Sequence, residues 1–504
     1  MSQITKSAAG RNVQSSIDPS TTRHDEKKFE DTDVGVTVLN GMVDELNYDN
    51  SEARKVVWKI DLFLLPLLAV TYMIQFLDKS CVSYAALWGM RTDAHLVGDQ
   101  YSWLTTVFYL GYMAGELPCN ILFQRFDIAR TCGIFITLWG VVLLCMTAAN
   151  NFAGLLTARL FLGILEAGRD EQPLRTCIWF SMNGMANILG GLIGYAIGYI
   201  NAAIPAWKFP FVIFGSLTIV WGVIFTLLTP SNPTKARWLT QREKAIAVLR
   251  LAENETGIDT KVWKWEQVKE AFVDPRFWLM NLLTLANTIP NGGVSAFAPL
   301  IVNSFGFTKF QSTLLGMPSG ASQVLSLWIS GYLAMKIKGI RHFLMIGGLL
   351  VALLGASLIY ALPDSNRVGR LLGYYLLIGF STTFVLSISL VQSNVAGRTK
   401  KTIYNTAFFV SYCVGNLIGP QLFFAREAPR YKSGFESWIV CFVVQIVIVT
   451  VMYIVNSREN RKRDRFYEGN NNGEGSIQNG QEDRIALGLS DLTDMQNEHF
   501  RYVL

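Results

Sequence analysis

Long apolar runs, separated by short polar stretches, recur along most of this chain. Each run is close to the length of about 20 residues that a helix needs to cross the hydrocarbon core of a bilayer at about 1.5 Å per residue. Six runs precede a longer polar stretch and six follow it, which predicts an all-α membrane protein with twelve transmembrane helices as two six-helix halves. The expected spans are 62–84, 101–123, 131–149, 152–168, 176–200 and 209–229, then 277–303, 311–335, 343–361, 371–392, 402–424 and 437–456.

Polar stretches divide the chain into five parts. Residues 1–56 have the composition of a disordered cytoplasmic tail, and residues 457–504 are similar in composition. Between the two halves, 57–229 and 277–456, residues 230–276 form a polar loop with apolar residues at helical spacing. We therefore expect two membrane bundles, a cytoplasmic central loop with short amphipathic helices on the inner face, and two cytoplasmic tails.

Composition and the distribution of charge support the membrane class. Hydrophobic residues make up 51% of the chain and charged residues 16%, which is typical of a membrane protein. The net charge of +6 does not indicate a nucleic-acid partner, because Lys and Arg concentrate in the loops and flanks on the side of both termini. By the positive-inside rule that side is the cytoplasm, although Arg426, Arg430 and Lys432 run against the trend. We expect a multi-pass protein of the plasma membrane with both termini in the cytoplasm and the lipid bilayer, not nucleic acid, as a partner.

The first span contains two adjacent charges, Asp78 and Lys79. A charge at the bilayer centre costs at least about 2.5 kcal/mol on insertion scales, so an intramembrane ionisable pair indicates a functional site that faces a water-filled cavity. Alternatively, the helix ends earlier, and both residues lie at the outer headgroup boundary with the Lys79 side chain reaching toward water. This stretch alone favours neither interpretation.

Charges inside the expected spans lie in the amino-terminal half. Besides Asp78 and Lys79, they are Glu116, Arg159 and Glu166. Arg159 and Glu166 are seven residues apart, so two helical turns place them on one face. If the first and fourth spans line a central crevice, the cations and acids of both spans can meet there, and protonation of a carboxylate would release a cation to hold an anionic substrate. The alternative is a static network of ion pairs that locks helices together.

Uncharged polar residues take the place of charges in the carboxyl-terminal half. Asn287 and Asn291 are the candidates for substrate binding, because amides can select a ligand by hydrogen bonding. Amides inside spans also bond one helix to another, which is the alternative for these residues. The seven cysteines show no metal-ligand spacing, and no nucleotide or nucleophile motif occurs, so the sequence predicts no metal site, no cofactor and no enzyme activity.

Five segments together resemble the fungal allantoate permease branch of the anion:cation symporters, within the major facilitator superfamily. The segments are WKIDLFLLPLLAVTYMIQFLDKS, GELPCNILFQRF, ARLFLGILEAG, PNGGVSAFAPLIVNSFGF and SNVAGRTKKTIYNTAFFVSYCVGNLIGPQ. The resemblance covers residues 50–460. It implies a secondary transporter that imports a small organic anion, such as allantoate, ureidosuccinate or another carboxylate, together with protons, and it assigns no oligomeric state.

The resemblance also assigns roles to the charged residues. In proton-coupled relatives the first-span acid and the fourth-span Glu take the proton, which implies proton-coupling roles for Asp78 and Glu166. The Arg seven residues before that Glu and the base after the acid handle charge and substrate, and these are Arg159 and Lys79 here. Lys79 stands where other branches often have Arg, so the charge is kept while the bidentate geometry is lost.

One departure from the family pattern follows the fourth span. The family usually continues after LEAG through an apolar stretch before a charged loop, whereas here Gly168 is followed directly by Arg169. The expected fourth span, 152–168, is then at the short end of what crosses a bilayer. A non-transporting sensor or degenerate paralogue is therefore the alternative function, and a missed exon would explain the same departure.

Overall fold

The chain divides into two units, of which the larger holds both helical halves. The larger unit is Lys59–Ser231 with Asn254–Leu504, and the smaller is Met1–Trp58 with Asn232–Glu253. In the smaller unit, Arg242 on a helix over 241–247 pairs with Glu52, with 3.0 Å between Nη2 and Oε2. The computed structural model describes residues 49–167, 176–200, 202–230, 236, 238–247, 263–470, 492–497 and 499–504.

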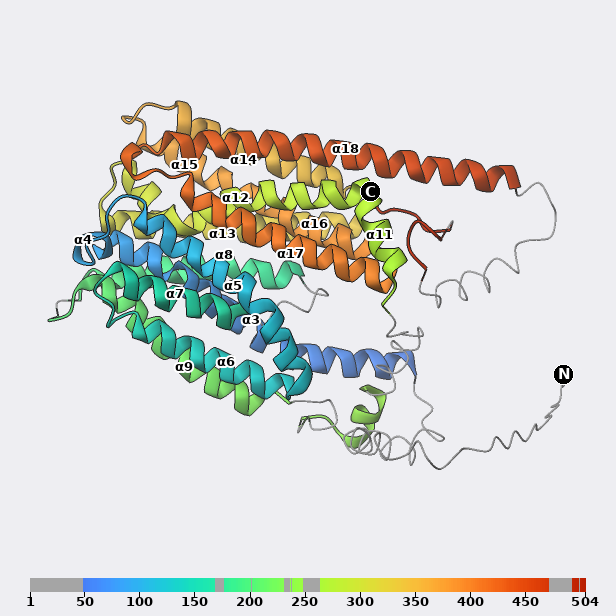
Figure 1. Ribbon diagram of the computed structural model, residues 1–504, viewed down its shortest axis with the longest axis horizontal. Coiled ribbons are helices and arrows are strands. Elements are labelled where there is room, and N and C mark those ends of the chain that lie inside the picture. The colour runs from blue at the N-terminus through green and yellow to red at the C-terminus, as the bar shows by residue number, and fades with distance from the viewer. Residues whose placement is uncertain are drawn as a thin grey trace. The chain divides into compact units, whose positions relative to one another are not determined.

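Six long helices make up the described part of the amino-terminal half, and Figure 1 shows how they are arranged. They are α3 (Asn50–Leu87), α5 (Gln100–Arg125), α6 (Ile128–Cys145), α7 (Phe152–Glu166), α8 (Thr176–Ile197) and α9 (Phe209–Leu228), with the short α4 (Met90–Asp93) after α3. Polar side chains set where they begin: Asp127 accepts from two backbone N–H groups at the start of α6, and Asn151 accepts from that of Gly154 in α7. α7 has only 15 residues, so it spans about 22 Å. Residues 168–175, where the departure from the family pattern falls, lie outside the described residues.

The carboxyl-terminal half follows a short helix, α11 (Trp265–Val273). Its helices are α12 (Pro275–Ser304), α13 (Lys309–Lys336), α14 (Arg341–Ala361), α15 (Arg367–Leu377), α16 (Ser381–Asn394), α17 (Arg398–Gln421) and α18 (Lys432–Asn470). The turn η5 (Ile378–Phe380) joins α15 to α16, and the three form one span. Asp274 caps α12 just before Pro275, and Thr308 with Gln311 forms a capping box at the start of α13.

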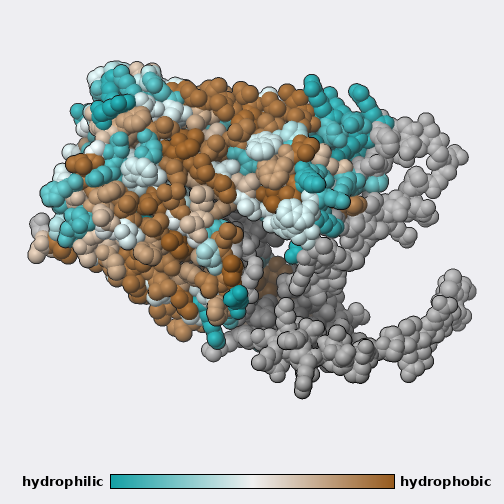
Figure 2. All heavy atoms as spheres, in the orientation of Figure 1, coloured by the Kyte–Doolittle hydropathy of each residue, from teal (hydrophilic) through white to brown (hydrophobic). Residues whose placement is uncertain are grey.

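These helices confirm the predicted all-α fold. Among the described helices, six are long and apolar enough by themselves to cross a membrane: α3, α6, α9, α14, the joined α15–α16 and α18. On the face seen in Figure 2, hydrophobic side chains cover the middle of the helices and hydrophilic side chains gather toward their ends. This distribution suits a protein whose helices cross the hydrocarbon core of a bilayer.

The remaining long helices meet one another at the boundary between the halves. α5 of the amino-terminal half packs against α17, and α8 packs against α13. Behind these pairs, α7 packs against α5 and α12 packs against α17. Helices that face other helices or a cavity need no continuous apolar surface, which accounts for the glycine and polar residues that interrupt the apolar stretches of these six.

Two glycines bring α8 and α13 into backbone contact. A Cβ atom built on Gly184 would collide with the carbonyl oxygen of Gly320, and a Cβ atom on Gly320 would collide with that of Gly184. The approach therefore leaves no room for a side chain on either helix, as in other close crossings of membrane helices. The close packing of α8 against α13, and with it of one half against the other, therefore requires glycine at both positions.

We expect Gly320→Ala to destabilise the protein by about 1–3 kcal/mol, because the added methyl group forces the α8 and α13 backbones apart. Thermal unfolding in detergent measures the effect as a lower melting temperature. Gly347→Ala on α14 is the matched control, since nothing lies within 4 Å of a Cβ atom built there. Equal melting temperatures for both variants would contradict the packing described.

Polar contacts also tie the halves together near the loops that follow α3 and α17. Tyr101 on α5 donates to the carbonyl oxygen of Ala296 on α12, with 2.5 Å between the oxygen atoms. Thr106 on α5 donates to the carbonyl oxygen of Leu417 on α17 at 3.1 Å and accepts from Gln421 at 2.8 Å. These contacts hold α5 against both α12 and α17 at this end of the spans.

α18 is longer than a bilayer requires. Its 39 residues extend about 58 Å, compared with about 40–45 Å for a bilayer with its headgroups. Figure 1 shows it running past the ends of the neighbouring helices. The expectation of a disordered segment from residue 457 is therefore wrong for the described part. The helix continues to Asn470, and residues 492–497 and 499–504 include several that are bound to the carboxyl-terminal half by hydrogen bonds described below.

Candidate functional site

The Lys79 ammonium and the Glu166 carboxylate form a buried ion pair between α3 and α7. Nζ and Oε1 lie 2.8 Å apart, and the two side chains are 15% and 1% exposed. Gln75, one helical turn before Lys79, donates from Nε2 to the same Oε1 at 2.7 Å. The expected approach of the first and fourth spans is thus observed at this pair.

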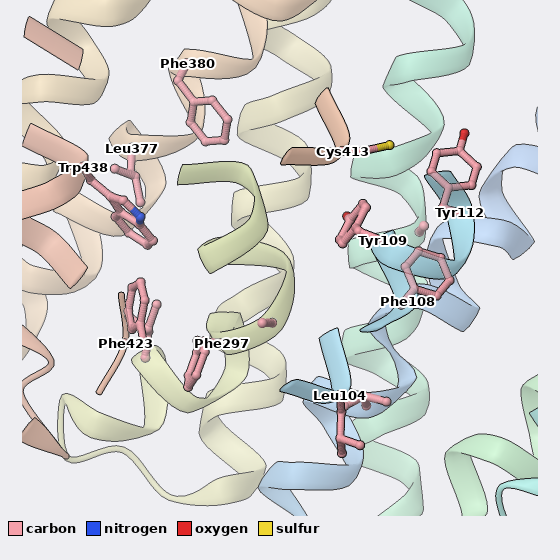
Figure 3. Close-up of a cluster of buried hydrophobic side chains, with 14 of the residues drawn as sticks. Leu104, Phe108, Tyr109, Tyr112, Phe297, Leu377, Phe380, Cys413, Phe423 and Trp438 are labelled. Carbon is pink, nitrogen blue, oxygen red and sulfur yellow. The ribbon is translucent and has the colours of Figure 1, made fainter. Parts of the chain in front are cut away.

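Three aromatic rings of α5 surround the Lys79 ammonium. Nζ lies 5.2, 5.6 and 6.0 Å from the ring centroids of Phe108, Tyr109 and Tyr112. Ring faces at this distance stabilise a cation by about 0.5–2 kcal/mol each. Figure 3 shows the three rings together on α5, with Cys413 of α17 nearby. We call these three rings and the Glu166 carboxylate the Lys79 cage.

A glycine on α7 allows α5 to come close enough to form the cage. A Cβ atom built on Gly163 would collide with the carbonyl oxygen of Phe108. Gly163 is three residues before Glu166 and four after Arg159, so the contact lies on the helical face that carries both charges. The spacing in the sequence therefore places the charges and the helix contact together.

Arg159 lies beside the cage and retains donor capacity. Its side chain is 3% exposed, Nη2 donates to the backbone oxygen of Lys79 at 3.4 Å, and Cζ lies 5.7 Å from the Phe108 ring centroid. Among the described residues, Nε of Arg159 has no hydrogen-bond partner. A buried guanidinium with an unused N–H group is able to bind an anion.

Asp78 faces another side of α3. It is 1% exposed, and Thr218 on α9 donates to its Oδ2 at 2.7 Å. Successive residues of a helix point about 100° apart, so Asp78 and the adjacent Lys79 meet different neighbours. The structure therefore gathers Lys79, Arg159 and Glu166 into one cluster and directs the Oδ2 atom of Asp78 toward α9.

Two adjoining cavities lie between the halves. A cavity of about 10 Å³ is lined by Lys79 and Arg159, together with side chains of α5 and α12. A larger cavity of about 50 Å³ is lined mainly by uncharged groups of α3, α8, α12 and α13. Ser83 and Ser295 line both, so the two spaces adjoin. Polar residues of the larger cavity include Asn187, Asn291, Gln323 and Tyr374.

The two asparagines expected from the sequence differ in position. Asn291 lines the larger cavity and donates to Oδ1 of Asn416 on α17 at 2.8 Å. Asn287 is 2% exposed and donates to Oε1 of Gln445 on α18 at 2.8 Å and to the backbone oxygen of Phe380 at 3.2 Å. Asn287 thus bonds helix to helix and is not among the residues that line the cavities, whereas Asn291 does both.

Sequence reasoning missed Gln75, Thr218 and the aromatic rings of the cage. Gln75 had a usable signal, because it precedes Lys79 by four residues and therefore shares its helical face. Thr218 and the rings had none, since their contacts depend on which faces of α5 and α9 meet α3. The sequence predicts no metal site, and the described residues contain no group of three or more His, Cys, Asp or Glu side chains placed to hold a metal.

Comparisons with known proteins give one consistent result. The family model of the Major Facilitator Superfamily matches residues 68–420. A Schizosaccharomyces pombe protein named as an uncharacterized transporter is 39% identical, with 91% of this chain and 89% of the relative covered. The allantoate permease of Saccharomyces cerevisiae is 35% identical, with coverage of 91% and 88%. The crystal structure of a D-xylose-proton symporter has a TM-score of 0.57 at 13% identity, covers 78% of this chain and 97% of its own, and supports the fold alone.

Proposed function

The chain belongs to the major facilitator superfamily of membrane transporters, and from that premise we propose that it imports a small organic anion together with protons. The observation that carries the proposal is the Lys79–Glu166 ion pair, which lies beside Arg159 at a cavity between the halves. A buried ion pair is costly to break, so ligands that replace one of its partners can shift the protein between states.

Glu166 takes the proton in this proposal. Among the described residues its Oε2 has no hydrogen-bond partner, so a proton can bind there while Oε1 keeps the bond from Gln75. Protonation removes the negative charge 2.8 Å from the Lys79 ammonium, and with it the attraction that holds the side chain in the cage. The ammonium and the Arg159 guanidinium then provide two positive charges for a carboxylate.

Asp78 is the second carboxylate with a proton-coupling role in this proposal. Its hydrogen bond from Thr218 joins α3 to α9, and α3 also carries Lys79. Protonation of Asp78 would weaken this bond, because a carboxylate is a stronger acceptor than a carboxylic acid. The charge of Asp78 can thereby influence the position of α3 in the amino-terminal half. Arg159 has a proton-coupling role as well, because its positive charge lies beside the Lys79–Glu166 pair.

The cavities indicate the kind of anion. In the proposed complex the carboxylate lies beside Lys79 and Arg159, and the rest of the substrate extends past Ser83 and Ser295 toward Asn291. The cavity beside the two cations, about 10 Å³, has room for about one water molecule, so the halves must separate for the substrate to enter. Neutral amide groups in the larger cavity select hydrogen-bonding groups, not a second charge. The similarity to an allantoate permease agrees with this arrangement, and we propose allantoate, ureidosuccinate or another small carboxylate as the substrate.

We also propose where the parts of the chain lie. The plasma membrane holds the two six-helix halves, 57–229 and 277–456, and the central loop 230–276 lies in the cytoplasm with both termini. The charge distribution supports this orientation, since Lys and Arg are abundant at the amino-terminal flank, in the central loop and after the last span. In this proposal Asn287 holds α12 against α18 through its hydrogen bond to Gln445, and Asn291 contacts the substrate.

Uptake by cells that express the protein tests the proposal. Labelled allantoate, ureidosuccinate, nicotinate and a dipeptide should be offered separately at external pH values on either side of neutrality. We expect accumulation of a carboxylate to rise as the external pH falls and to disappear with a protonophore. Accumulation that does not depend on the proton gradient would contradict proton coupling, and absence of uptake for all four would contradict the substrate class.

The short α7 favours a second candidate, a sensor or degenerate paralogue that does not transport. Its 15 residues are fewer than the about 20 that a span usually needs. Insertion of a family-like apolar segment between Gly168 and Arg169, together with sequencing of the transcript, separates the two candidates. If only the extended chain reaches the cell surface and transports, the chain as written is a degenerate form.

A further inference from the structure

The last residues of the chain are bound to the carboxyl-terminal half. Thr493, Asp494 and Tyr502 are 0%, 1% and 2% exposed, which is unusual for polar residues near a terminus. We call the described residues of 492–504 the C-terminal strap. All of its contacts named below are with α11, α12, α16, α17 and α18, so they lie within one half of the bundle.

A fully buried lysine at the start of α17 is the centre of the contact. Lys400 is 0% exposed, and its Nζ lies 2.9 Å from Glu270 of α11, 3.1 Å from Asp274 and 2.8 Å from Asp494 of the strap. A charge without water is tolerated only when partners surround it. Three segments of the chain therefore supply carboxylates to a single ammonium, and the strap supplies one of them.

Arg276 of α12 extends this cluster to the strap's tyrosine. Its Nη1 donates to the Tyr502 hydroxyl at 2.6 Å, and its Cζ lies 3.7 Å from the centroid of that ring. The Tyr502 hydroxyl donates to Asp494 at 2.8 Å. Burial, and then the neighbouring Asp494, raise the pKa of Tyr502 above its ordinary value, so the hydroxyl keeps its proton and remains a donor.

Two asparagines bind the strap backbone through both sides of their amides. Asn394 of α16 donates to the backbone oxygen of Val503 at 3.0 Å and accepts from its N–H at 2.7 Å. Asn460 of α18 does the same with Tyr502, at 2.8 and 2.9 Å. Arg463 donates to the backbone oxygens of three strap residues, Asp494, Asn497 and Phe500. The extension of α18 beyond the bilayer thus serves as one side of a peptide-binding surface.

The strap is attached to a helix that also touches the other half. Lys400 lies at one end of α17, and Leu417 and Gln421 at the other end contact Thr106 of α5. Between these ends, the Tyr412 ring lies 6.2 Å from that of Tyr109, a member of the Lys79 cage. α17 therefore connects the strap to the contacts with α5 and to the Lys79 cage, and a shift of this helix would alter both.

We propose that the C-terminal strap is an intramolecular ligand of the surface formed by α11, α12, α17 and α18, and that its docking sets the position of α17 against α5. Almost all of its attachment is polar: ion pairs, charge-assisted hydrogen bonds and amide–backbone bonds. When the strap leaves, water can take the place of its polar groups, and Lys400 keeps Glu270 and Asp274 as partners, so the released form leaves no unpaired buried charge on Lys400. Release of the strap loosens the contact between the halves and changes the rate at which they separate.

The experiment compares the full chain with a chain that lacks residues 492–504 and with Asp494→Asn, which keeps the shape of the side chain but removes its charge. Arg501→Ala is the matched control, because Arg501 lies in the strap but pairs with Asp464, which is 57% exposed. The main measurement is the alkylation rate of Cys413 by N-ethylmaleimide in proteoliposomes, followed by mass spectrometry. Cys413 lies on α17, is 1% exposed and is not in a disulfide.

We expect deletion of the strap to raise the alkylation rate of Cys413 about fivefold or more, the change that about 1 kcal/mol produces in an opening equilibrium. Asp494→Asn should raise it in the same direction, and Arg501→Ala should leave it unchanged. A synthetic peptide of residues 492–504, added on the side of the termini, should restore the slow rate in the deleted chain. Because this readout needs no substrate, its outcome is independent of whether the proposed anion is correct.

Two results would overturn the proposal. One is an unchanged alkylation rate of Cys413 in a folded Asp494→Asn variant and in the deleted chain. The other is a lower melting temperature with no change at Cys413 and no restoration by the peptide, which would make the strap a passive part of the fold. If the deleted chain fails to fold, Asp494→Asn and the peptide added in competition with the native strap give the answer.

Discussion

Uphill accumulation of the substrate should disappear when Glu166 is replaced by Gln, while exchange of substrate across the membrane persists. Gln has nearly the shape of a protonated Glu and carries no charge, so the variant imitates the proton-bound form permanently. The Lys79 ammonium, now 2.8 Å from a neutral amide instead of a carboxylate, is free to bind the anion. Without a proton to release, the variant only equalises concentrations, so the accumulation ratio should fall to about one.

Counterflow in proteoliposomes measures this directly: vesicles preloaded with unlabelled substrate take up labelled substrate by exchange, and a proton gradient is imposed separately. Asp78→Asn provides the comparison, because Thr218 can still bond to the new amide and the Lys79 cage is untouched. We expect Asp78→Asn to lose accumulation as well. Normal proton-driven accumulation in both variants would show that neither carboxylate couples the proton.

Lys79→Ala should cost both stability and substrate binding. The substitution leaves the Glu166 carboxylate buried, 1% exposed, with a hydrogen bond from Gln75 but without its ion-pair partner. Removing one partner of a buried ion pair in this way costs about 3–5 kcal/mol of stability. That is a large part of the about 5–15 kcal/mol that stabilises a typical domain. The variant should show a markedly lower melting temperature and little uptake. Lys79→Arg keeps the charge and should retain much of both.

The double variant Lys79→Ala with Glu166→Gln separates the two effects. It removes both charges together, so the melting temperature should recover most of the loss, whereas uptake of a carboxylate should not. A static ion pair that serves only to hold α3 against α7 predicts a different result, namely recovery of uptake along with stability.

Small alkylammonium ions should also restore part of the stability of Lys79→Ala, since the rings of Phe108, Tyr109 and Tyr112 remain to receive them.

Most of the fold could be predicted from local patterns in the sequence. Apolar runs of bilayer length and caps such as Asp127 and Thr308 act within a few residues, so the helices and their order are predictable from the chain alone. The three-residue turn between α15 and α16 and the extension of α18 to Asn470 were not predicted. The extension contacts a segment more than thirty residues away in the sequence, because Arg463 donates to backbone oxygens there, and no local pattern reveals such a contact.

The candidate site was predictable to the extent that helical spacing decides it. Arg159 and Glu166 share a face because they are two turns apart, and the apposition of α3 and α7 brings Glu166 to Lys79. The sequence could not assign Asn287 to its bond with Gln445 instead of the cavity, because the two choices differ only in the rotation of α12 about its axis. Rotation of a helix is set by packing against several neighbours, which no local pattern contains.

The docked carboxyl terminus bears on how the protein is produced and detected. Residues 502 and 503 are bound to Asn460 and Asn394, so a fluorescent protein or affinity tag fused to Leu504 would pull on a segment that the bundle holds. An expression assay that uses such a fusion would then report on a protein whose strap is displaced. A label at the amino end avoids this, and an antibody raised against the last ten residues should recognise denatured protein on a blot far better than native protein in a membrane.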